Sequence, residues 1–170
     1  MDDMWSGAPV MEGASSEEMW VEVAPAVSLR VLIWKPDDAA AAGKNPVVMV
    51  PGWGSVFEGW RPLVTEWVKR RPLYYIETRD KGSAKIDRPV MKSDFPMEKH
   101  GEDVAAVLEA LGIDRLSLVA CDLVKLGFEL ADFLGHGAVP DLDLGGGLVH
   151  DVDGLVRQEP IGDVAAGQLG

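Results

Sequence analysis

Short apolar stretches alternate along this chain with longer segments of helical periodicity. The stretches NPVVMVPG (45–52), PLYYIETR (72–79) and LSLVA (116–120) have the length and the β-branched and aromatic content of strands. The run VVMV in the first of them is wholly apolar and is bounded by proline on both sides, which is typical of a strand buried on both faces of a parallel sheet. We therefore predict that these segments are strands of one sheet.

Two helices are predicted between these strands. GWRPLVTEWVKR (59–70) and SDFPMEKHGEDVAAVLEALG (93–112) each gather apolar residues on one helical face, and the second ends at Gly112. The apolar face of the first is Trp60, Leu63, Val64, Trp67 and Val68, and that of the second is Val104, Val107, Leu108 and Leu111. This order predicts an α/β fold, a doubly wound and mostly parallel sheet with right-handed crossovers, whose ligands bind at the carboxyl ends of the strands.

A pair of strands is predicted ahead of this alternation. MWVEVA (19–24) and SLRVLIWKP (28–36) both read as strands and are close enough in sequence to pair as a hairpin. In the second, we expect Leu29, Val31 and Ile33 to face the core and the intervening residues to face away.

The chain is expected to divide into three parts. Residues 1–18 mix Gly, Ser, Ala and acidic residues without a period and are predicted to form a flexible arm. Residues 19–152 would form the α/β domain, incomplete at its C-terminus, and residues 153–170 an irregular tail.

The charge of the chain adds a constraint, since a net charge of −12 repels phosphate backbones and anionic lipid surfaces. Nucleic acid and membranes are therefore not expected as partners, and we predict a cytoplasmic protein.

Metal and disulfide chemistry have little support in the sequence. Cys121 is the single cysteine, which excludes an internal disulfide, and the three histidines, His100, His136 and His150, show no metal-binding spacing. We expect no metal and no cofactor. His100 is predicted to lie at the surface or its boundary, and His136 near a helix C-terminus.

Three segments of the predicted alternation resemble the α/β-hydrolase family. PVVMVPGWGSVFEGWRPLV (46–64) looks like the third strand and oxyanion loop of that family, and YYIETRDKGSAKID (74–87) like its fourth strand and the turn that follows. FPMEKHGEDVAAVLEALGIDRLSLVA (95–120) looks like the helix that leads into the nucleophile strand. The resemblance covers about Met19 to Val152 and implies a hydrolase whose nucleophile sits on a strand-turn-helix elbow.

The resemblance assigns roles to individual residues. The backbone N–H groups of Trp53 and Leu123 would form the oxyanion hole, and Asp122 would occupy the nucleophile position, where the family's G-x-S-x-G pattern has serine. Haloalkane dehalogenases and epoxide hydrolases use aspartate there: its carboxylate attacks carbon and forms an ester that water hydrolyses. DLDLGGGLVHDVDG (141–154) looks like the sixth strand and its exit, which nominates Asp151 as the acid. The triad histidine is not found.

Other interpretations of the elbow stay open. Asp122 would equally serve as the N-cap of the following helix, and Val124 places a branched side chain where the elbow needs a small one. Cys121, one position earlier, is expected to be a small buried hydrophobe.

Three hypotheses of function follow. The first is a hydrolase of a small neutral ester, amide, epoxide or halide. The second is a non-catalytic relative that binds a small molecule or forms a homo-oligomer through an exposed sheet edge. The third is an incomplete, inactive copy, for which cooperative folding would be weak or absent.

Overall fold

The computed structural model describes residues 7–120 and 148–151. Every strand predicted above and both helices predicted between the strands are present, with boundaries that differ by a few residues, whereas the helix expected after Asp122 lies outside the described residues. In chain order the elements are β1 (Ala14–Ala24), β2 (Val27–Pro36), α1 (Ala39–Ala42), β3 (Val47–Val50), α2 (Phe57–Trp67), β4 (Leu73–Glu77), β5 (Lys85–Ile86), η1 (Lys92–Asp94), α3 (Met97–Leu111), β6 (Ser117–Ala120) and β7 (Leu148–Asp151).

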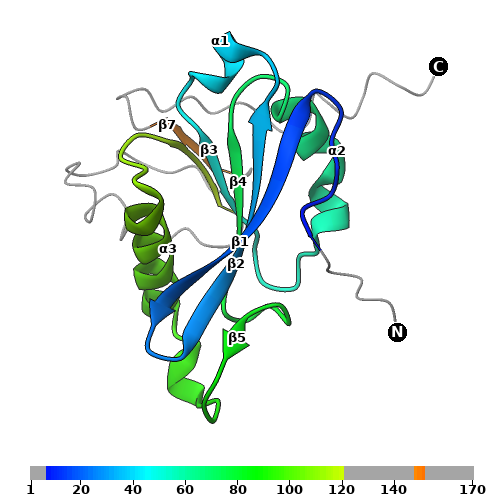
Figure 1. Ribbon diagram of the computed structural model, residues 1–170. Helices are drawn as coiled ribbons and strands as arrows, with labels where there is room; N and C mark the ends of the chain where they lie inside the picture. Colours follow the sequence, from blue (N-terminus) through cyan, green and yellow to red (C-terminus); the bar gives the residue numbers. More distant parts are fainter. Residues whose placement is uncertain (1–6, 121–147, 152–170) are drawn as a thin grey trace.

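The strands form one mixed sheet. Their order is β1-β2-β4-β3-β6-β7, with the two-residue β5 beside β2. The central strands β4, β3 and β6 are parallel, and β1 and β2 form the predicted hairpin. Helices α2 and α3 lie on opposite sides of the sheet (Figure 1). The α/β class and the helices on both faces are confirmed.

Side chains that alternate along β3 bind the two helices to the sheet. Val48 and Val50 belong to the core on the α3 side, whereas Val47 and Met49 belong to the core on the α2 side. All four are at least 96% buried, as expected of a wholly apolar strand between two layers. The predicted helical faces are buried: Val104, Val107 and Leu108 of α3 and Val64 of α2 belong to the two cores, and Leu111, Trp60, Leu63 and Trp67 pack against them. Three helix residues that the prediction did not name also join the cores, Met97 and Ala105 of α3 and Phe57 of α2.

Helix α3 ends where its glycine predicted. Gly112 adopts a left-handed conformation with φ of 64°, and its N–H bonds to the carbonyl of Glu109. The next amide, that of Ile113, reaches back to the carbonyl of Leu108 at 3.0 Å. This satisfies carbonyl groups that the helix end would otherwise leave without partners.

Two predictions about the first hairpin were wrong. Strand β1 begins at Ala14 rather than near Met19, because the backbone of residues 14–18 pairs with the far end of β2 despite the polar side chains. Strand β2 does not alternate between a buried and an open face, since Arg30 and Leu32 are each only 2% exposed. The sheet is covered on both sides at β2, and Arg30 is accommodated by Glu18, 2.7 Å from its Nε, and by the carbonyl of Gly7.

The strand predicted near residue 148 is present but runs antiparallel to β6. In the register of this pair, Asp151 lies opposite Ser117, the first residue of β6, and Leu148 lies opposite Ala120, the last. Asp151 is therefore separated from the carboxyl end of β6 by about 10 Å, the length of a four-residue strand. The backbone of Asp151 therefore lies near the amino end of β6, and its role as an acid stays a prediction.

Candidate functional site

The loops that follow β3 and β4 meet at the carboxyl edge of the sheet, as predicted. Lys81, in the β4 loop, donates hydrogen bonds from Nζ to the carbonyl oxygens of Gly52 at 2.7 Å and Ser55 at 3.2 Å, both in the β3 loop. Ala120, the end of β6, lies opposite Val50, the end of β3. The loop after β6 therefore starts beside the other two, and its remaining residues, including Cys121, Asp122 and Leu123, lie outside the described residues.

The β3 loop turns tightly between Gly52 and Ser55. The Ser55 amide donates to the Gly52 carbonyl at 3.1 Å, and Gly54 has φ of +77°, a conformation that favours glycine. The Trp53 side chain projects outward and is 83% exposed. The loop is thus a defined turn whose carbonyl groups are bound by Lys81, and its backbone conformation at position 54 favours glycine.

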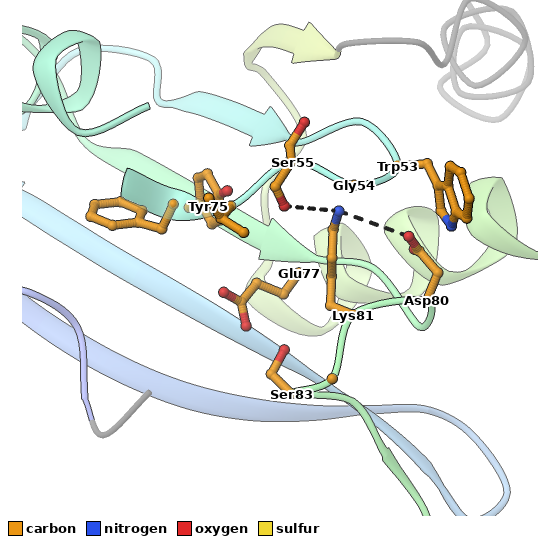
Figure 2. Close-up of a pocket in the computed structure, with 11 residues that line it drawn as sticks. Trp53, Gly54, Ser55, Tyr75, Glu77, Asp80, Lys81 and Ser83 are labelled. Atoms are coloured by element: carbon orange, nitrogen blue, oxygen red, sulfur yellow. Dashed lines mark hydrogen bonds and ion pairs between the residues drawn. The ribbon is translucent and has the colours of Figure 1, made fainter. Parts of the chain in front are cut away.

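Charged groups of the β4 loop surround this contact. The Lys81 side chain is 13% exposed, and its Nζ lies 3.8 Å from Oδ2 of Asp80. The Thr78 hydroxyl donates to the other oxygen of Asp80, Oδ1, at 2.5 Å. Figure 2 shows Lys81 extending to the β3 loop with Asp80 beside it. The pair places a positive charge against the turn at Trp53 and fixes the adjacent carboxylate.

A cavity of about 330 Å³ opens beside this turn. Phe57 and Tyr75 contribute apolar surface, and Glu77, Lys81 and Ser83 contribute polar atoms. Burial, and to a lesser degree the charge of Glu77, raises the pKa of Tyr75 above its usual range, so its hydroxyl stays protonated at neutral pH. Glu77 is 4% exposed, and Nη1 of Arg30 lies 3.7 Å from its Oε2. The cavity can accept a small neutral ligand.

The β4 loop is fastened to α3 by a buried ion pair. Arg79 donates from Nε to Oδ2 of Asp103 at 2.6 Å and from Nη2 to Oδ1 of the same carboxylate. Their side chains are 3% and 2% exposed. Arg79 Nη1 also lies 3.8 Å from Asp94, which Arg88 binds with two hydrogen bonds. The position of Asp80 and Lys81 is therefore set by the packing of the loop on α3.

His100 contradicts its prediction as a surface or boundary residue. It lies in the first turns of α3, is 6% exposed, and lines a second cavity of about 460 Å³ together with Trp53 and Asp80. Its Nδ1 lies 3.8 Å from Oδ1 of Asp80. The helical period carried the signal, because His100 precedes Val104 by four residues and so shares the buried face.

The remaining predicted residues are not brought into this site by the described part of the chain. His136 lies outside the described residues, and for His150 and Asp151 only the backbone of β7 is described. Among residues 7–120 and 148–151, no three His, Cys, Asp or Glu side chains group closely enough to hold a metal ion. Within the same residues, no helix has the length and hydropathy needed to cross a membrane.

Comparisons with known proteins give matches only at the level of structure. No protein-family model matches the chain, and no curated protein matches it. An epoxide hydrolase mutant from Vigna radiata matches with a TM-score of 0.56 and 25% identity, over 74% of this chain and 36% of that one. Epoxide hydrolase A from Mycobacterium thermoresistibile matches with a TM-score of 0.53 and 17% identity, over 69% and 35% of the two chains.

An α/β hydrolase from Novosphingobium aromaticivorans matches with a TM-score of 0.57 and 18% identity, over 72% of this chain and 41% of that one. The chain thus spans less than half of each of these three solved structures. The resemblance stated from the sequence is confirmed: this chain has the α/β-hydrolase fold.

Proposed function

We propose that this chain acts as a hydrolase on a small neutral ester, amide, epoxide or halide. The observation that carries the proposal is the turn at Trp53, which lies at the carboxyl edge of the sheet, is fastened by Lys81, and borders a cavity that fits a small molecule. Solved structures of the same fold include two epoxide hydrolases, which supports an epoxide as one substrate class.

The chemistry proposed for an epoxide uses three residues. The Asp122 carboxylate attacks a ring carbon, the ring C–O bond breaks, and the oxygen leaves with the electron pair as an alkoxide, which takes a proton from water. The backbone N–H groups of Trp53 and Leu123 stabilise the oxyanion of the subsequent ester hydrolysis, in which water adds and a diol is released. Asp151 is left out of this scheme, because β7 places its backbone opposite Ser117.

Lys81 would support this chemistry without touching the substrate. Its ammonium group binds two carbonyls of the turn that contains Trp53, and a positive charge close to a turn favours negative charge that develops on the other side of it. The carboxylate of Asp80, at 3.8 Å from Nζ, reduces this effect. We therefore assign Lys81 a positioning role, and we expect its main effect to be on the geometry of the turn.

The test begins with a thermal melt of the purified 170-residue chain, followed by circular dichroism. A cooperative transition would show that the chain is folded, and hydrolysis is then assayed with styrene oxide, 1-bromobutane and 4-nitrophenyl acetate. Asp122→Asn should abolish turnover and leave the melt unchanged, because the amide cannot attack carbon. Cys121→Ala, the neighbouring substitution, is the matched control and should retain activity. Turnover by the Asp122→Asn variant at the rate of the unaltered chain would refute the assignment.

A second candidate function is binding through the sheet edge. β1 lies at one end of the strand order, and its 11 residues make it a long edge. Its exposed positions include Glu17 and Glu22, and charges on an edge disfavour pairing with a second sheet. For this reason we place the hydrolase first. Light scattering on the purified chain tests for a dimer formed through this edge. If such a dimer is the functional form, its dissociation should also unfold the chain.

A further inference from the structure

The second cavity has a composition that selects its ligand. It shares Trp53 and Asp80 with the cavity beside Tyr75 and is lined by residues of the β3 loop, the β4 loop and the start of α3. Pro51, Trp53, Phe95 and Met97 give it apolar walls. Phe95 is 41% exposed and Trp53 is 83% exposed. Apolar walls with a few polar groups at one side are typical of sites for small organic molecules.

His100 lines this cavity and has a buried ring nitrogen without a hydrogen-bond partner among the described residues. Nδ1 of His100 faces the Asp80 carboxylate at 3.8 Å. Within residues 7–120 and 148–151, no hydrogen-bond partner reaches the other ring nitrogen, Nε2, although it is buried. A carboxylate attracts the N–H of a neutral imidazole, so the proton belongs on Nδ1 and the lone pair on Nε2.

Asp80 is itself held in place, which fixes this orientation. The Thr78 hydroxyl donates to the Asp80 oxygen that faces His100, and Lys81 Nζ lies 3.8 Å from the other oxygen. The three groups form a chain in which a cation and a hydroxyl keep the carboxylate beside the imidazole. The Asp80 carboxylate therefore has a fixed position 3.8 Å from Nδ1 of His100.

The charge state of His100 agrees with an acceptor. Burial lowers its pKa; the carboxylates of Asp80 and Asp103 oppose this, and the cations of Arg79 and Lys81 add to it. The net direction is downward, so the imidazole is neutral at pH 7. A buried acceptor without a partner is costly, and most native structures supply one.

We propose that this cavity binds a small, uncharged and largely apolar molecule that carries one hydroxyl group, and that the hydroxyl donates a hydrogen bond to Nε2 of His100. The apolar body of the ligand packs on Phe95 and Met97, and its hydroxyl satisfies the buried nitrogen. The proposal does not depend on Asp122 or on hydrolysis, and it holds or fails independently of the proposed function.

The test uses benzyl alcohol and toluene as probes, which differ in the hydroxyl group. Each is titrated into the ¹⁵N-labelled full chain, and the imidazole ¹⁵N resonance of Nε2 in His100 is followed, assigned by its loss in the His100→Gln variant. The chemical shift of Nε2 should change with benzyl alcohol concentration until the site is saturated. The change should have the direction expected for a nitrogen that accepts a hydrogen bond. Toluene should bind at least about fivefold more weakly, the equivalent of one lost hydrogen bond.

Two variants separate the acceptor from simple packing. His100→Phe keeps a ring but has no acceptor, and should weaken benzyl alcohol about five- to tenfold with little effect on toluene. His100→Gln places an amide oxygen at a similar reach, and should retain benzyl alcohol binding. For the variants, binding is read from the ligand signals, and Lys99→Gln, on the exposed side of the same helical turn, is the control.

A change of pH gives a measurement on the unaltered chain. Protonation of His100 removes its lone pair, so benzyl alcohol affinity should be constant near pH 7 and fall as the pH drops through the lowered pKa of this residue. The charged groups that face His100 are the carboxylates of Asp80 and Asp103 and the cations of Arg79 and Lys81. Equal affinities of the two probes, or an Nε2 resonance that benzyl alcohol leaves unmoved, would overturn the proposal.

Discussion

The buried ion pair between Arg79 and Asp103 gives a sharp test of how the site is held together. Asp103→Asn keeps the shape of the side chain but removes its charge and replaces one acceptor oxygen with a donor. The guanidinium of Arg79 would then lose one of two hydrogen bonds and most of its charge compensation. The loop that carries Asp80 and Lys81 would lose its attachment to α3.

The expected cost follows from burial. Both side chains are at most 3% exposed, and removal of one partner from a buried pair typically costs about 3–5 kcal/mol. Asp94 Oδ1, 3.8 Å from Nη1 of Arg79, keeps part of the compensation, so we expect a value near the lower end, about 3 kcal/mol. With a urea dependence of about 2 kcal/mol per molar, the unfolding midpoint should fall by about 1.5 M.

The chain provides a matched control on its surface. Arg61 binds Glu58 with the same two-bond geometry, at 2.7 Å for each bond, but these side chains are 41% and 68% exposed. Glu58→Gln should leave the urea midpoint unchanged within error, because exposed pairs are screened by water. The double variant Arg79→Met with Asp103→Leu should recover most of the loss, since no buried charge is left unpaired. Equal midpoint shifts for Asp103→Asn and Glu58→Gln would refute the reasoning.

Three further predictions concern pH, turn strain and the loop at Trp53. Hydrogen bonds from Arg88 and from the Met91 amide hold the pKa of Asp94 well below its usual range. The contribution of Asp94 to stability is therefore present above about pH 4 and is lost as the pH falls toward the folded-state pKa. Asp94→Asn should flatten the acid side of a profile of urea midpoint against pH, measured from about pH 7 to about pH 2. Ala26 has φ of 60° in the β1–β2 turn, so Ala26→Gly should raise the free energy of unfolding by about 0.5 kcal/mol, whereas Ala24→Gly in the extended strand should lower it, as read from thermal melts. Lys81→Met removes both bonds to the β3 loop, and hydrogen exchange of the amides of residues 54 and 55 should accelerate about tenfold while that of α3 stays constant; unchanged exchange would show that the turn holds itself.

The periodicity of the sequence was enough to locate the layers of this fold. The apolar run in β3 predicted burial on two faces, and the helical repeats predicted which sides of α2 and α3 join the core. These features depend on backbone geometry that repeats every two or 3.6 residues, so they are readable from a single chain. The contact between the loops after β3 and β4 was also predictable, because neighbouring parallel strands end at the same edge.

The errors arise where the environment comes from distant segments. Arg30 was expected to face away from the core, but it is buried with Glu18 and the carbonyl of Gly7 as its partners. Both partners lie in residues 1–18, which the local pattern predicted to be a flexible arm. The direction of β7 was likewise not readable, because antiparallel and parallel pairing place similar demands on a four-residue apolar segment.

The sequence by itself determined the α/β class, the two-sided burial of the sheet and the glycine that ends α3, because each depends on a local repeat or a backbone conformation. Only the tertiary structure decided that His100 is buried beside Asp80 and that Lys81 reaches the carbonyls of Gly52 and Ser55. These contacts join residues that are 20 to 29 positions apart in the chain, on loops and a helix from different strand-helix units. Their distances are set by the packing of α3 and the loops on the sheet, which no local pattern encodes.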